Sequence, residues 1–154
     1  MLARHSSSCF ALALALALPA GVLAADADTP VPAAGRYVLA VQMILPHLDE
    51  MRRITVRDER CLTAGQVAGL FPVFDQPALR GCKLEYPKRG AESTDYVLVC
   101  ESARVATGTA HIITAEDGAI FGLLEVKMGG KNMTFTQRSV AERLGECPSP
   151  APPG

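Results

Sequence analysis

The sequence predicts a mainly β domain: a curved antiparallel meander of about seven strands, with one short helix and two disulfides. Apolar residues recur at every second position through most of residues 35–147, which is the period of a strand with one buried face. Short segments rich in Gly, Pro and Asp separate these stretches and are typical of tight turns. Four cysteines follow the N-terminal leader, an even number that predicts disulfides. The pattern fits both an open sheet and a barrel-like closed one.

The first 24 residues have the form of a secretory signal peptide. A positively charged start precedes an apolar run at residues 10–18, and Val22-Leu23-Ala24 is the small-residue ending expected before cleavage. The run is shorter than the roughly 20 apolar residues of a membrane span, and Pro19 interrupts it. We therefore expect export to the periplasm with cleavage after Ala24, and no transmembrane segment in the mature protein.

The remaining chain is expected to hold one domain. Residues 25–34 form a flexible lead-in rich in Pro and Ala, residues 35–147 form a single β-rich domain, and residues 148–154 (PSPAPPG) form a disordered Pro-rich tail. The formal net charge is −1, which is too close to neutral for a surface that tracks phosphates. Nucleic acid is therefore not an expected partner.

Two strands are expected at the start of the domain. The first has alternating apolar residues, Tyr37, Leu39, Val41 and Met43. The second, at about residues 53–60, is only weakly apolar and is therefore expected at an edge of the sheet.

A short helix is expected after the second strand. Thr63 and Gln66 have the spacing of a capping box, which predicts a helix over residues 64–70. Residues 71–80 contain Pro72 and Pro77 and are expected to form an ordered loop that covers one end of the sheet.

Residues 82–100 form the central predicted element, a hairpin with a cysteine at each outer end. Opposed residues in an antiparallel pair have a constant sum of residue numbers, and Cys82 opposite Cys100 gives 182. A shift by one residue would turn the polar face toward the core. The chosen register places apolar and aromatic partners together, Leu84 with Leu98 and Tyr86 with Tyr96. We therefore predict a Cys82–Cys100 disulfide and, by elimination, a Cys61–Cys147 disulfide.

Three further strands are expected at about residues 104–114, 119–128 and 131–143. A two-residue turn at Gly129-Gly130, with both glycines at positive φ, would join the last two strands. It pairs Val126 with Met133 and Leu124 with Phe135.

The loop before residue 119 sets the other register. Gly118 in the left-handed conformation would place Ala110 opposite Leu124 and Gly108 opposite Val126. The opposite face then carries a partly apolar set: Thr109, His111, Phe121, Leu123 and Thr136.

No pattern in the sequence indicates catalysis or a cofactor. His47 and His111 lie far apart in the sequence, and no G-x-S-x-G nucleophile motif is present. The cysteines lack C-x-x-C spacing, so no metal site is expected. Neighbouring carboxylates in a strand point to opposite faces, and the pairs are interpreted as solvated residues: Asp49/Glu50, Asp58/Glu59 and Glu116/Asp117. We therefore expect a protein that is not an enzyme.

Five segments carry a resemblance: DERCLTAGQVAGLF, GCKLEYPKRGAESTDYVLVC, ATGTAHI, IFGLLEVKM and RLGEC. The chain resembles the small secreted proteobacterial proteins of domain-of-unknown-function family 3617. Where members carry a Trp soon after the leading Gly, this chain has Tyr37 and Val38. The family framework falls on Gly35, Cys61 with Thr63, Cys82, Cys100, and Gly145 with Cys147. The resemblance implies a periplasmic location and supplies no established activity.

Two functions of different classes fit these observations. The first is a non-enzymatic periplasmic domain that binds an apolar ligand or a partner segment, suggested by Phe121 and Leu123 on the second sheet face. The alternative is an envelope accessory or structural protein that acts through protein contact, with the edge strand at residues 53–60 receiving a partner strand. The sequence indicates neither the identity of a ligand or partner nor the oligomeric state.

Overall fold

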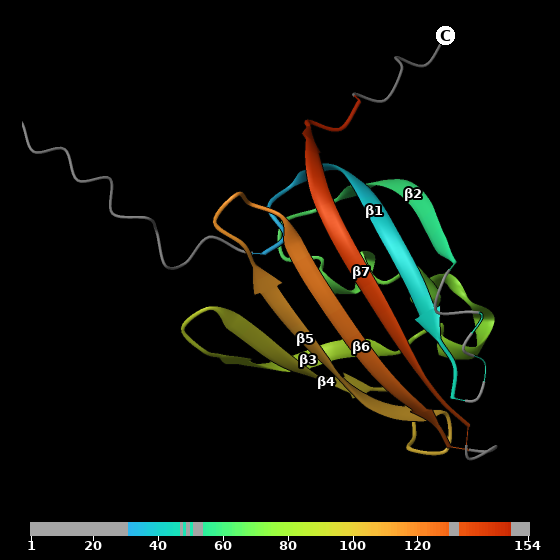
Figure 1. Cartoon of the computed structure of the whole chain (residues 1–154). Coiled ribbons are helices and arrows are strands. Elements are labelled where there is room, and N and C mark those ends of the chain that lie inside the picture. The colour runs from blue at the N-terminus through green and yellow to red at the C-terminus, as the bar shows by residue number, and fades with distance from the viewer. Residues whose placement is uncertain (1–30, 47, 49, 51–53, 130–132, 149–154) are drawn as a thin grey trace, which may run out of the picture.

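A computed structural model describes residues 31–46, 48, 50, 54–129 and 133–148. These residues form one antiparallel sheet of seven strands in the order β2-β1-β7-β6-β5-β4-β3 (Figure 1). The strands are β1 (Gly35–Ile44), β2 (Thr55–Leu62), β3 (Lys83–Arg89), β4 (Ser93–Val99), β5 (Ala106–Thr114), β6 (Ile120–Met128) and β7 (Met133–Gly145). The mainly β class, the disulfides and the edge position of β2 are confirmed. The sheet is open, because β2 and β3 are unpaired edges.

The connector between β2 and β3 lies over one face of the curved sheet, which we call the inner face. It contains three short 3-10 helices, η2 (Val67–Leu70), η3 (Pro72–Asp75) and η4 (Pro77–Leu79). Figure 1 shows the sheet curling so that β5, β4 and β3 turn behind β6. The core forms where alternate strand residues meet the connector: Tyr37, Leu39, Val41, Leu98, Ala110, Ile112, Ile120, Leu124, Val126, Phe135 and Ala141 from strands, with Val67, Leu70, Phe71, Val73 and Leu79.

Phe71 is a fully buried side chain of the connector. Its ring is fully buried and lies over Gly122 in β6, where an added Cβ would stand 2.8 Å from the ring Cζ. The connector therefore packs against the middle of the sheet, whereas the sequence placed it over one end. The absence of a side chain at Gly122 is what makes room for the ring.

Only the second half of the helix predicted over residues 64–70 forms, as the 3-10 helix η2. Gly65 has a φ of +74°, which ends any regular helix there, and only η2 follows it. Half of the predicted capping box is present, because the Thr63 N–H donates to Gln66 Oε1 at 2.9 Å. Local polar contacts therefore form a turn, and the packing of Leu70 and Phe71 fixes the rest.

The stapled hairpin is confirmed at its outer end. Disulfides join Cys82 to Cys100 and Cys61 to Cys147, with Cα–Cα distances of 4.2 and 5.6 Å, and Leu84 faces Leu98. The expected Tyr86/Tyr96 pair is wrong, because the register shifts after residue 85. Pro87 has no N–H for the ladder, and Tyr86 takes a φ of +54° and is 70% exposed.

The turn before β6 is confirmed, and the turn after β6 is not. Gly118 has a φ of +84°, and Ala110 and Gly108 face their predicted partners. Val126 faces Phe135 rather than Met133, a displacement of two residues that leaves every side chain on its predicted face. Residues 130–132 lie outside the described residues.

The role of Gly129 also differs from the prediction. Gly129 is not among the described residues with positive φ. An added Cβ there would stand 2.3 Å from the carbonyl oxygen of Ala103. Glycine is therefore needed for close contact with the loop before β5.

The folded domain begins earlier than residue 35. Pro32 is fully buried, and its carbonyl accepts a hydrogen bond from the Gly65 N–H at 2.8 Å. The Tyr37 hydroxyl donates to the Ala33 carbonyl at 3.0 Å. Residues 31–34, which the sequence assigns to the flexible lead-in, thus belong to the packed domain.

Candidate ligand site

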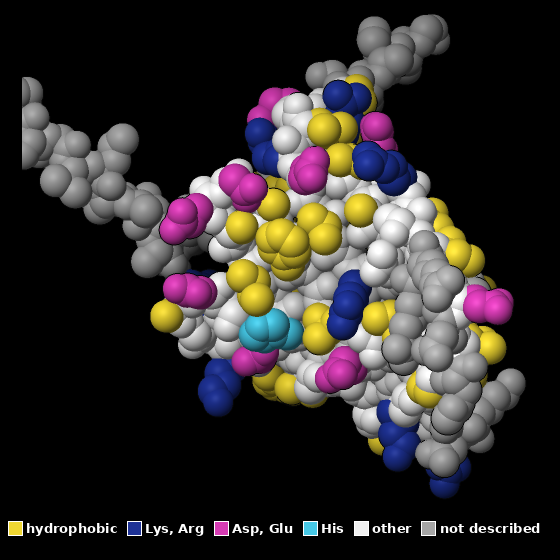
Figure 2. Space-filling view, in the orientation of Figure 1, with side chains coloured by type: hydrophobic (Ala, Val, Ile, Leu, Met, Phe, Trp, Pro, Cys, Tyr) yellow, Lys and Arg dark blue, Asp and Glu magenta, His cyan; other side chains and the backbone are white. Residues whose placement is uncertain are grey.

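The outer face of the sheet carries the partly apolar set that the sequence predicts. Phe121 and Ile113 are 44% and 38% exposed, and Leu123 and Val140 are half-buried beside them. Figure 2 shows hydrophobic side chains gathered next to the histidine on this face. The surface holds a shallow hollow of about 280 Å³.

The histidine on this face is His111, and it contacts Asp95 on the neighbouring strand. The two residues are directly opposed, and the His111 Nδ1 lies 2.5 Å from the Asp95 Oδ1. Both side chains are exposed, at 43% and 57%. The other cross-strand neighbour of His111 is Leu123, so this row offers no nucleophile to the pair. His47, the other predicted candidate, lies outside the described residues.

The more promising hollow lies on the inner face, between β1, β2 and η3. It has a volume of about 420 Å³, within the usual range for small-molecule sites. Its wall combines buried and exposed apolar side chains: Val41, Met43, Ile54, Val56, Pro72 and Val73. Four polar or charged residues also border it: Arg57, Asp58, Gln76 and Gln137. We call this space the inner cavity.

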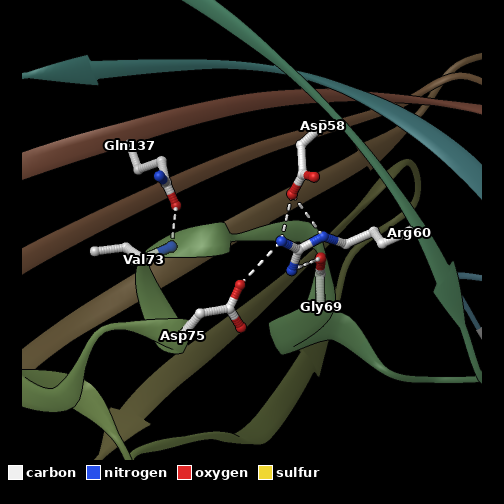
Figure 3. A network of polar contacts seen from close by, with 6 residues as sticks. All are labelled: Asp58, Arg60, Gly69, Val73, Asp75 and Gln137. Atoms are coloured by element: carbon white, nitrogen blue, oxygen red, sulfur yellow. Dashed lines mark hydrogen bonds and ion pairs between the residues drawn. The ribbon is translucent and has the colours of Figure 1, made fainter.

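An ion-pair network lies beside the inner cavity, and Asp58 belongs both to this network (Figure 3) and to the cavity wall. Arg60 binds Asp58 through Nε at 3.0 Å and also through Nη2. The same guanidinium reaches Asp75 at 2.9 Å and the Gly69 carbonyl at 3.3 Å. β2 alternates, so Asp58 and Arg60 lie on its inner face and Glu59 on its outer face. The network therefore ties the edge strand to the connector.

This arrangement stabilises the protonated, positively charged form of Arg60. Burial alone lowers the pKa of Arg60, but the hydrogen bonds and charges of Asp58 and Asp75 outweigh burial and raise the pKa above its usual value. One guanidinium thus faces two carboxylates, which leaves the network with one net negative charge.

Gln137 is a buried residue of the cavity wall. It is opposite Met43 in the β1–β7 register and is only 3% exposed. Its Oε1 accepts a hydrogen bond from the backbone N–H of Val73 at 3.3 Å (Figure 3). This contact joins the sheet to η3 and fixes the orientation of the amide, because a backbone N–H can donate only to the oxygen.

A larger hollow of about 570 Å³ lies near the β5–β6 loop and residues 31–33. Two of its polar side chains are engaged: the Tyr37 hydroxyl donates to the Ala33 carbonyl, and Arg143 donates to the Ala34 carbonyl and Glu146. Its other polar lining residues are exposed, Thr114, Asp117 and Glu142, whereas the inner cavity has the buried polar side chain of Gln137.

The sequence prediction placed Val41 and Met43 on one strand face but missed the polar residues of the inner cavity. Asp58 was interpreted only as a solvated carboxylate, and Gln137 was not considered. One signal was available for Gln137: it stands between Phe135 and Ser139 at an inward position of an otherwise apolar alternation. A polar side chain at such a position needs a partner inside the fold.

Comparisons with known proteins add no relatives. No family model, no curated protein and no solved structure matches the chain. The resemblance to family 3617 therefore stays a prediction. Within the described part of the chain, no three metal-binding side chains come together. In the same residues, no helix has the length and apolar character to cross a membrane.

Proposed function

We propose that this protein is an exported, non-enzymatic binding domain that holds a small apolar ligand in the inner cavity. The observation that carries this proposal is the pairing of exposed and buried apolar side chains in one hollow. Ile54 and Val56 are 54% and 58% exposed and line the same space as the buried Val41 and Val73. Covering such exposed apolar surface with a ligand is favourable, by about 25 cal/mol for each Å² removed from water.

The inner cavity is a better ligand site than the outer face. The apolar residues of the outer face surround a hollow of about 280 Å³, against about 420 Å³ for the inner cavity. A concave site surrounds more of a small molecule than a shallow one does, and small-molecule sites are therefore usually concave. The outer face is the natural place for a control substitution.

A periplasmic location is part of the same proposal. The two disulfides are typical of proteins that mature in an oxidising compartment. The signal-peptide pattern of residues 1–24 and the resemblance to family 3617 support the periplasm in particular.

A second function is favoured by the position of β2. This strand is an unpaired edge of the sheet, and an edge strand can receive an extended segment from a partner. In this case the protein would be an envelope accessory or structural protein, and Ile54 and Val56 would contact the added strand.

Fluorescence titration with N-phenyl-1-naphthylamine, an uncharged apolar dye, tests the first function. We expect Val56→Lys to weaken dye binding by about tenfold, since losing an apolar contact in a pocket is worth about 1–3 kcal/mol. Phe121→Lys, a change at a residue of similar exposure on the outer face, should leave binding unchanged. If the dye does not bind the wild type, or if only Phe121→Lys weakens binding, the inner cavity is not the site.

Native mass spectrometry of the protein purified from periplasm separates the two functions. A retained small molecule, lost in Val56→Lys, supports the ligand-binding domain. A stoichiometric complex with one protein, and no small molecule, supports strand addition at β2 instead.

A further inference from the structure

The amide of Gln137 leaves an unused hydrogen-bond donor at the inner cavity. Its Oε1 is taken by the Val73 N–H, which leaves the two N–H groups of Nε2. Among the described residues, no hydrogen-bond partner lies against this nitrogen, although the side chain is only 3% exposed. Every described side-chain nitrogen or oxygen that is fully shielded from solvent has a hydrogen-bond partner. The unpaired Nε2 of Gln137 must therefore be accessible, and Gln137 lines the inner cavity. We infer that its free N–H groups face the cavity.

A buried donor of this kind favours a ligand that carries an acceptor. An apolar molecule without one would cover the Nε2 of Gln137 and leave it with no partner at all, which is unfavourable. A carbonyl oxygen at the end of an apolar body would accept the hydrogen bond and allow the body to contact Val41, Met43 and Val73.

The charges around the cavity exclude an anionic acceptor. Asp58 lines the space, and the Arg60 guanidinium is already shared between Asp58, Asp75 and the Gly69 carbonyl. Arg57 also borders the cavity, but strand alternation places its side chain on the outer face, beside Ala40. A carboxylate entering the cavity would lose its water and meet a net negative network.

We propose that the inner cavity selects an uncharged apolar molecule with a carbonyl group, such as an ester, amide or ketone, whose oxygen accepts a hydrogen bond from Gln137 Nε2. This inference rests on the proposed function and names the ligand class for that site. The cavity volume of about 420 Å³ lies within the range of small-molecule sites and suits a simple ester such as methyl octanoate.

The test is displacement of N-phenyl-1-naphthylamine from the wild-type protein at neutral pH by three molecules of matched chain length. Methyl octanoate has the uncharged carbonyl, decane has no hydrogen-bond acceptor, and octanoate is charged. After correction for partition from water into an alkane, the ester should bind about tenfold more tightly than decane does, because only the ester pairs with the buried donor. Octanoate should be weaker than the ester by at least the same factor.

Gln137→Glu is the matching variant. It keeps an oxygen for the Val73 N–H and removes the Nε2 donor, so the corrected preference for the ester over decane should disappear. Gln42→Glu is the same change on the outer side of β1 and should keep that preference. If Gln137→Glu does not fold, Gln137→Met tests the same loss, and the ligand series on the wild type stands without either variant.

The outcomes separate this inference from the proposed function. If ester and decane, after the same correction for partition, bind the wild type equally, the inference is wrong and the cavity is simply an apolar site. If octanoate matches the ester, the exclusion of anions is wrong. If neither the dye nor any of the three molecules binds, both the inference and the proposed function are wrong.

Discussion

The contact between Phe71 and Gly122 can be tested by filling the space that the glycine leaves. A Cβ on residue 122 would stand 2.8 Å from the Phe71 Cζ and 3.0 Å from its Cε1. The ring is fully buried, so moving it would disturb its other packing contacts. Gly122→Ala should therefore introduce overpacking, which costs about 1–3 kcal/mol.

Two opposing effects set the size of the result. Replacing Gly by Ala within a strand is favourable by roughly 0.5–1 kcal/mol, because the unfolded chain loses less freedom. The net effect of Gly122→Ala on the wild type should be a loss of about 1 kcal/mol in the free energy of unfolding. In a Phe71→Leu background the Cε1 and Cζ atoms are absent, so the same substitution should be neutral or stabilising by up to about 1 kcal/mol.

Equilibrium urea denaturation of the four proteins in this double-mutant cycle measures the coupling, with the disulfides intact. The expected coupling of about 1–3 kcal/mol exceeds the error of about 0.5 kcal/mol with which distant substitutions add. Ser139→Ala is the control, because the Ser139 Oγ lies 2.7 Å from the same Cβ but can rotate away. An equal penalty in the wild-type and Phe71→Leu backgrounds, or relief by Ser139→Ala alone, would show that the ring is not packed on Gly122.

Two further predictions concern the disulfides and the tyrosines. The Cys82→Ser/Cys100→Ser variant should lose about 3 kcal/mol in urea denaturation, because the bond closes a loop of 18 residues; unchanged stability would contradict this. Burial raises the pKa of Tyr37, against a smaller lowering by the positive charge of Arg143, and it raises the pKa of Tyr96 in the same way. The unfolded state then loses these protons at lower pH than the folded state does, so stability should fall as the pH rises above about 10. Tyr37→Phe should reduce that fall and remove one late step from the ultraviolet titration of phenolate. An unaltered titration in this variant would contradict the assignment.

The sequence predicted the parts of the fold that depend on local patterns. Alternation placed the strands and their faces, and the constant-sum argument placed Leu84 opposite Leu98. The loop before β6 was predictable because Gly118 alone supplies the left-handed residue that it needs. In each case the deciding interaction lies within one hairpin, so the sequence around it carries the information.

The errors arose where a distant segment decides the local structure. Gly129 was assigned to a tight turn, but it is required by the carbonyl of Ala103 in another loop. Thr63 and Gln66 have the spacing of a helix cap, but Gly65 takes a left-handed conformation in which its N–H reaches the Pro32 carbonyl. Such contacts join segments that the sequence pattern treats as independent.

The inner cavity follows from the same feature that placed β2 at the edge of the sheet. On the inner face of β2, Asp58 and Arg60 occupy positions that a fully covered strand would give to apolar residues. These charged groups hold the connector through the ion pair with Asp75, and they keep contact with water, with side-chain exposures of 20% for Arg60 and 37% for Asp58. The connector therefore cannot pack on this part of the sheet as Phe71 does on β6, and the space left over is the cavity. A weakly apolar strand pattern is thus informative about a binding site when its polar residues fall on the inner face.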